Sequence, residues 1–175
     1  RDMYQSMAGV FMHRPYHRMP ENALSALYVW GLGRSHSEEH QDELKAICED
    51  AGASYEAVVT EMRSDPHLFG SVLDGESDPA VYKNAMGVAR YFRSTDKFKS
   101  VVKNKMTVGS ELMMDLGNLY TAALPAWLAA GIEEAFETEL ELAGQEFLLV
   151  GYGSGDAAES LTVKMVEDWR EHAHR

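Results

Sequence analysis

The stretch Gln145-Glu146-Phe147-Leu148-Leu149-Val150-Gly151 decides the fold class of this 175-residue chain. Its apolar run lacks the alternation of a half-exposed strand, and such runs are typical of strands covered on both faces of a sheet. A second short apolar run, Gly9 to His13, is bounded by a glycine and by Pro15 and predicts another strand. Helical periodicity dominates the chain between these two runs, so the sequence predicts an α/β fold.

The segments between and after the two strands carry the signals of helices. Apolar residues recur at helical spacing, and Pro, Ser, Asp and Gly stand where helices begin or end. The expected helices are 20–32 (ended by Gly31 and Gly33), 37–50 (N-cap Ser37), 54–63, 78–92 (N-cap Asp78, Pro79 in the first turn), 96–105 and 121–137. We expect a loop at 65–77. The patterns of the segments 107–116 and 160–171 each fit either a strand or a helix, so both segments are left unassigned.

Composition and charge exclude several classes of function. The net charge of -12 argues against nucleic acid and against an anionic membrane surface as a partner. No apolar run reaches the roughly 20 residues that span a bilayer, and 119–132 is expected to be a buried helix. The length fits one domain. The single cysteine, Cys48, excludes an intrachain disulfide and favours a reducing cytoplasm.

The start of the chain carries no recognisable signal peptide. Its first residue is Arg1 rather than Met, from which we expect processing, truncation or a split protein.

His13 is the first candidate for chemistry. Histidine is the side chain best suited to move protons near neutral pH. His13 stands at a strand end, two residues before a proline, so its backbone would be held rigidly at the edge of a sheet. Functional sites of α/β proteins are commonly found at such edges. Spacing alone nevertheless favours a structural histidine that bonds to a backbone carbonyl.

Two later motifs add a second and a third candidate. Asn118 precedes an apolar helix, where its amide fits either a helix N-cap or a donor to an oxyanion. Gly151-Tyr152-Gly153-Ser154-Gly155 follows the apolar strand, and its glycines would let backbone N–H groups approach a ligand. The pattern differs from the Gly-x-Ser-x-Gly of hydrolases, and no suitable acid–histidine pair follows it.

Other patterns that suggest chemistry have simpler explanations. His36, Glu39 and His40 have the spacing of some zinc peptidases, but no third ligand follows, so we expect a solvated helix face and no metal. Cys48 has no basic neighbour and is expected to be buried and inert. The lysines within 97–105 fit a solvated helix face or a patch that attracts phosphates.

Three of these motifs, in this order, resemble the C-terminal half of 3-hydroxy-3-methylglutaryl-CoA synthase, a family with a thiolase-like fold. His13, Pro15, Tyr16 and Met19 match its aromatic-His-x-Pro-aromatic-x-Lys-Leu/Met motif. Residues 117–121 resemble its Gly-Asn-x-Tyr-Thr, and 151–155 resemble Phe-Ser-Tyr-Gly-Ser-Gly, a loop that lines the acyl pocket. The likeness covers 9–27 and 78–168, and Lys97 to Lys105 would then face the phosphates of CoA.

The resemblance implies a single C-terminal thiolase-like domain over residues 1–175. Its mixed sheet would be covered by helices, with a helical insertion at about 35–77. Three positions depart from the family: Arg18 replaces the usual lysine, Asn22 a second lysine and Gly151 a serine. The first two changes affect how the chain would hold the phosphates of CoA.

The resemblance also implies an activity, the condensation of acetyl-CoA with acetoacetyl-CoA to 3-hydroxy-3-methylglutaryl-CoA in the mevalonate pathway of isoprenoid biosynthesis. The family's cysteine is acylated, its glutamate generates the enolate, and hydrolysis releases the product. His13 would bind and polarise the acetoacetyl thioester and move protons, and Asn118 would lie beside it. The residues implied for substrate binding are Tyr16, Arg18, Tyr120, Tyr152 and Ser154.

Partners and alternatives follow from the same comparison. The family's cysteine and glutamate lie upstream of its histidine, so we expect an N-terminal half as partner and no activity from this chain alone. The family implies a cytoplasmic homodimer with CoA thioesters as substrates and no cofactor. Two alternatives remain: a ketoacyl or β-branching synthase that acts on a carrier protein, which the acidic charge disfavours, and a noncatalytic half that pairs with a separate chain.

Overall fold

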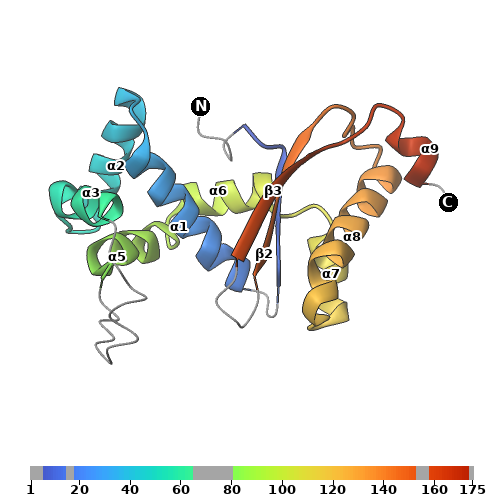
Figure 1. Cartoon of the computed structure of the whole chain (residues 1–175), viewed down its shortest axis with the longest axis horizontal. Helices are drawn as coiled ribbons and strands as arrows, with labels where there is room; N and C mark the ends of the chain where they lie inside the picture. Colours follow the sequence, from blue (N-terminus) through green and yellow to red (C-terminus); the bar gives the residue numbers. More distant parts are fainter. Residues whose placement is uncertain (1–5, 15–17, 65–80, 153–157, 174–175) are drawn as a thin grey trace. The chain divides into compact units, whose positions relative to one another are not determined.

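The computed structural model describes residues 6–14, 18–64, 81–152 and 158–173 (Figure 1). The elements run in the order β1 (Gly9–Met12), α1 (Met19–Arg34), α2 (Glu38–Asp50), α3 (Tyr55–Arg63), α5 (Lys83–Phe92), α6 (Asp96–Lys105), α7 (Ser110–Leu116), the 3-10 helix η1 (Tyr120–Ala122), α8 (Ala123–Glu137), β2 (Glu146–Tyr152), β3 (Ala158–Lys164) and α9 (Trp169–Ala173). The chain divides into two compact units, a sheet unit of Arg1–Glu21 and Lys99–Arg175 and a helical unit of Asn22–Phe98.

The sheet unit is built on a mixed three-stranded sheet in the order β1-β2-β3. β1 pairs with β2 in parallel, with Phe11 opposite Leu149, and β2 pairs with β3 in antiparallel fashion. All of β1 is buried, whereas almost every residue of β3 is exposed. The predicted α/β class and both predicted strands are confirmed. The segment 160–171, which the sequence left unassigned, contains most of β3, a short connection and the start of α9.

One face of β1 and β2 is covered by α8. The Phe11 ring lies edge-on to Trp127 of α8 at 5.6 Å and beside Phe147 at 5.8 Å. Gly131 allows this close approach, because an added Cβ would lie 3.0 Å from the Phe11 ring. The predicted helix 121–137 is therefore confirmed, and α8 is the element that buries the sheet.

Residues just before α7 fix that helix against α8. Gly109 has a φ of 71°, and its N–H donates to the Glu134 carboxylate at 2.7 Å. Trp127 Nε1 donates to the carbonyl oxygen of Val108 at 2.9 Å. A Cβ on Gly109 would lie 2.3 Å from the backbone nitrogen of Gly131, so only glycine fits here. The segment 107–116, which the sequence left unassigned between strand and helix, is therefore a tight turn followed by a helix.

The helical unit has an aromatic core. Tyr28 of α1 stacks on Phe92 of α5 at 4.6 Å, and Phe92 lies edge-on to Phe98 at 5.5 Å. One face of α2 and one face of α5 are buried, formed by Leu44, Ile47 and Cys48 and by Ala85, Val88, Ala89 and Phe92. On α1, Leu27 stands at helical spacing from buried Leu24 but is 36% exposed, while Val29 is fully buried.

The prediction that Gly31 and Gly33 end the first helix is wrong, since α1 continues to Arg34. Gly33 serves packing instead: an added Cβ would lie 2.1 Å from the sulfur of Met62 in α3. A glycine placed for a close helix contact looks, in sequence, like a glycine that ends a helix.

The start of α5 also differs from the prediction. The predicted cap, Asp78, and Pro79 lie outside the described residues, and the helix begins at Lys83. Its first turn is capped from α3, because the Glu61 carboxylate accepts from the backbone N–H of Asn84 at 3.1 Å and of Ala85 at 2.9 Å. This cap comes from a residue more than twenty positions upstream, so local spacing does not reveal it.

No helix within the described ranges is both long and apolar enough to cross a membrane. The predicted buried helix 119–132 corresponds to η1 and most of α8.

Glu61→Ala should destabilise the helical unit by about 1 kcal/mol, because it leaves helix-end N–H groups of α5 without their acceptor. Urea unfolding followed by circular dichroism measures the change. Glu49→Ala, on the exposed side of α2, is the matched control and should be neutral. Equal effects of the two substitutions would show that Glu61 does not act as a cap.

Gly109→Ala should destabilise the sheet unit by more than about 2 kcal/mol, since alanine meets both the positive φ and the backbone of α8. Gly87→Ala is the control: it lies in α5 with open space around it, so the substitution should stabilise by about 0.5–1 kcal/mol. Thermal unfolding of both variants tests the pair, and a neutral Gly109→Ala would contradict the packing described.

Candidate functional site

His13 lies directly after β1, at the carboxyl end of the strand. Its backbone N–H donates to the carbonyl oxygen of Val150 at 2.8 Å, which extends the pairing with β2 by one residue. Its half-buried ring lies edge-on to Tyr152, with the ring centroids 5.0 Å apart. Because β1 and β2 are parallel, their carboxyl ends meet at one edge of the sheet, and ligands of α/β proteins bind at such edges.

Tyr152 also connects this edge to the start of α1. Its hydroxyl contacts the sulfur of Met19, the first residue of that helix. Arg18 stands exposed in the turn just before Met19. Two other predicted binding residues, Tyr16 and Ser154, lie outside the described residues.

Asn118 lies between α7 and η1, where its side chain organises a turn. Its Oδ1 accepts from the backbone N–H of Tyr120 at 2.9 Å, which closes a turn directly before η1, whose N-cap residue is Leu119. Gly117 and Tyr120 both have positive φ angles, of 67° and 53°. The Nδ2 of Asn118 makes no hydrogen bond to the described part of the chain, so this amide keeps donors for a ligand. Tyr120 is 75% exposed.

The orientation of α8 brings the Asn118 turn to the same end of the sheet as His13. An added Cβ on Gly151, near the end of β2, would lie 3.8 Å from Leu124 in the first turn of α8. Further along α8, Gly131 contacts Phe11 in the middle of β1. The helix therefore runs opposite to the strands, and Figure 1 shows α7 and the start of α8 at the carboxyl end of β1 and β2. Among the described contacts, no hydrogen bond joins Asn118 to His13.

The sequence prediction missed Arg14, which lies next to His13 and is only 6% exposed. Its Nη1 donates to the carbonyl oxygen of Ser110 at 3.3 Å, and its guanidinium lies over the Trp127 ring at 5.1 Å. Burial lowers the pKa of Arg14, and the charge of Glu21 acts in the opposite direction. The only signal in the sequence is an arginine two residues after the last residue of a buried strand.

The remaining candidates take part in local contacts. His40 Nδ1 shares a hydrogen bond with Ser35 Oγ at 2.8 Å, and the described ranges hold no group of three His, Cys, Asp or Glu side chains arranged for a metal ion. Cys48 is 1% exposed, and burial raises the pKa of its thiol. Lys97 pairs with Glu43 at 2.9 Å in the helical unit.

The predicted phosphate patch is divided between the two units. Lys97 belongs to the helical unit, whereas Lys105 belongs to the sheet unit, where it donates to the carbonyl oxygen of Met7. Burial lowers the pKa of Lys105. At least these two lysines have protein partners, and binding of CoA phosphates by the run stays a prediction.

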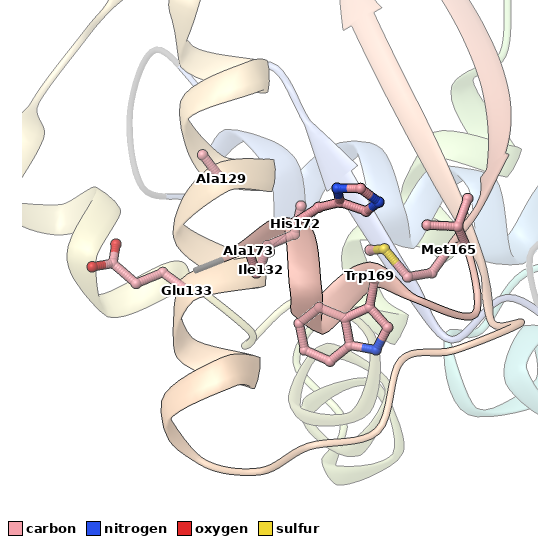
Figure 2. A pocket seen from close by; sticks show the side chains of 8 residues that line it. Ala129, Ile132, Glu133, Met165, Trp169, His172 and Ala173 are labelled. Carbon is pink, nitrogen blue, oxygen red and sulfur yellow. The ribbon is translucent and has the colours of Figure 1, made fainter. Parts of the chain in front are cut away.

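A surface hollow of about 490 Å³ lies elsewhere in the sheet unit, between α8 and the segment 165–173, which includes α9 (Figure 2). Its walls come from Ala129, Ile132, Glu133, Met165, Val166, Trp169, His172 and Ala173. None of the predicted site residues lines it, and its part of α8 lies beyond the first turn that meets the end of β2. The hollow is therefore separate from the His13 edge.

Comparisons with known proteins agree with the fold and the motifs. A solved structure, MvaS in complex with 3-hydroxy-3-methylglutaryl coenzyme A, superimposes with a TM-score of 0.57 at 20% sequence identity. The match covers 98% of this chain and 29% of that one, so the chain spans under a third of its length. At this identity the match shows a shared thiolase-like fold alone. A search of curated protein sequences finds no match.

A family model gives the identification. The model described as hydroxymethylglutaryl-coenzyme A synthase C terminal matches residues 1–175, the whole of the chain. The three motifs that carried the resemblance all fall inside this match. The chain thus belongs to the hydroxymethylglutaryl-CoA synthase family, as a representative of its C-terminal region.

Proposed function

We propose that this chain is the C-terminal part of an enzyme that condenses acetyl-CoA with acetoacetyl-CoA to give 3-hydroxy-3-methylglutaryl-CoA. The observation that carries the proposal is the contact of His13 with Tyr152 at the carboxyl ends of β1 and β2, in a chain that matches the family over its whole length. The ligand named for MvaS is the product of this condensation, which supports CoA thioesters as ligands here.

His13 would act on the acetoacetyl thioester. An imidazole N–H can donate to the oxygen of the carbonyl group whose carbon the enolate attacks, and it can deliver a proton as that oxygen becomes a hydroxyl. The backbone bond of His13 to Val150 and the contact with the Tyr152 ring support this role, because both restrict where the imidazole can lie.

Asn118 would supply a neutral donor to the same developing charge. Its Oδ1 is held by the N–H of Tyr120, which orients the amide group and leaves the Nδ2 hydrogens for an oxyanion. The exposed Tyr120 and Arg18, with Tyr16, Tyr152 and Ser154, would bind the acyl and CoA parts of the substrate. The reaction requires no metal or redox cofactor.

The nucleophilic cysteine and the catalytic glutamate would come from an N-terminal half outside this chain. Cys48 is a poor nucleophile, because it is buried and its pKa is raised. Apolar side chains of α7 support a covering partner: Leu112, Met114 and Leu116 are 46%, 56% and 52% exposed. We therefore expect no condensation by the 175-residue chain alone. A cytoplasmic homodimer stays part of the proposal.

The experiment co-expresses this chain with the N-terminal half of a family enzyme that carries the cysteine and the glutamate. Release of CoA thiol from acetyl-CoA and acetoacetyl-CoA should appear with the pair and be absent with either half alone. A parallel assay offers acetoacetyl groups on a carrier protein. Turnover only with the carrier would replace the CoA proposal by a β-branching synthase, and no turnover with either acceptor would favour a noncatalytic half.

In the active pair, His13→Ala should lower the rate about 10²- to 10⁴-fold, and Asn118→Ala about 10²- to 10³-fold. His172→Ala is the matched control, since this exposed histidine of α9 lies at the separate hollow, and its rate should stay unchanged. The assignment would be contradicted if the two-chain enzyme with His13→Ala kept the native rate. It would also be contradicted if the enzyme with His172→Ala lost as much of its rate as the one with His13→Ala.

A further inference from the structure

Arg14 is the one buried charged side chain among the described residues, and it adjoins His13 in the chain. In the motif that carries the family resemblance, this position is variable, so neither the motif nor the proposed reaction assigns it a role. A buried guanidinium is costly unless several groups compensate for its lost hydration. Its contacts therefore show what the structure gains from keeping it there.

Those contacts join three elements of the sheet unit. The backbone of Arg14 directly follows His13 after β1, and its Nη1 donates to the carbonyl oxygen of Ser110, the first residue of α7. Its guanidinium faces the Trp127 ring of α8 at 5.1 Å, a distance at which cation and ring attract. The charge of Glu21, in the first turn of α1, favours the cation. One planar side chain thus connects β1, α7 and α8.

The connection matters because α7 leads directly to Asn118. The helix ends at Leu116, Gly117 follows with a positive φ, and Asn118 holds the turn that opens η1. A displacement of α7 relative to the end of β1 would therefore move Asn118 relative to His13. No described hydrogen bond joins these two residues directly, whereas the contacts of Arg14 link the segments that carry them.

We propose that Arg14 is a positioning residue that fixes the α7–Asn118 segment against the His13 end of β1. Its importance for catalysis rests on the function proposed above, whereas its effect on the two segments is a property of this chain alone. Lysine is no substitute, because a guanidinium can lie flat on the indole ring while it donates to a carbonyl oxygen, and an ammonium has no such plane.

Amide hydrogen exchange on the 175-residue chain tests the proposal without any substrate. Arg14→Met keeps much of the length and loses charge and donors. The amides of His13 and Tyr120 should then exchange at least about tenfold faster, while amides in the middle of β2 change less than about twofold. Arg14→Lys should show the same selective loss in weaker form. If Arg14→Met fails to fold, Arg14→Lys decides the question.

Arg170→Met is the matched control. Arg170 also lies over an indole ring, that of Trp169 at 4.6 Å, and also donates to a backbone carbonyl, that of Leu140 at 2.9 Å. Its loss should leave exchange at His13 and Tyr120 unchanged.

In Arg14→Ala, added ethylguanidinium should restore slow exchange at both amides, and ethylammonium should not, because a merely structural cavity would not distinguish the two cations. Three results would overturn the proposal: unchanged exchange in the lysine and methionine variants, uniform acceleration across β2, or equal rescue by both cations. None of them bears on whether His13 acts on a thioester, which the co-expression assay decides.

Discussion

The parallel pairing of β1 with β2 is the constraint on which the rest of the site depends. It places the residue after β1, His13, beside Tyr152 at the end of β2. The pairing is stable because α8 covers it, with Phe11 against Trp127 and Gly131. Since α8 runs opposite to the strands, the same packing carries the Asn118 turn to the carboxyl edge. One set of apolar contacts thus determines both where the candidate catalytic groups lie and which end of the sheet they share.

Apolar pattern predicted most of the architecture. The apolar run at 147–150 and the apolar stripes of α2, α5 and α8 are long. Only one type of secondary structure can bury the apolar side chains of each pattern. The errors concern tertiary contacts that local spacing does not encode. Gly33 was expected to end a helix and instead admits Met62 of α3, and the cap of α5 comes from Glu61. Both partners are distant in sequence, so propensity alone could not have found them.

The candidate site was only partly predictable, for a related reason. Motif resemblance named His13, Asn118 and Tyr152 as candidates, and the structure shows the contacts of two of them: a ring contact for His13 and a turn for Asn118. Resemblance passed over Arg14, because a variable motif position carries no signal until the side chain is seen between β1, α7 and α8. Contacts supply what a motif cannot, namely how the segments that bear the motifs are held together.

The central claim is that the carboxyl edge of β1 and β2 is where this chain meets a CoA thioester. The most direct measurement titrates acetoacetyl-CoA into the chain and follows the NMR signals of the His13 ring, the Asn118 side-chain amide and the Trp169 indole. The account predicts saturable shifts at His13 and Asn118 with Trp169 unchanged. Shifts confined to Trp169, at the separate hollow, or no shift at His13 and Asn118, would contradict it.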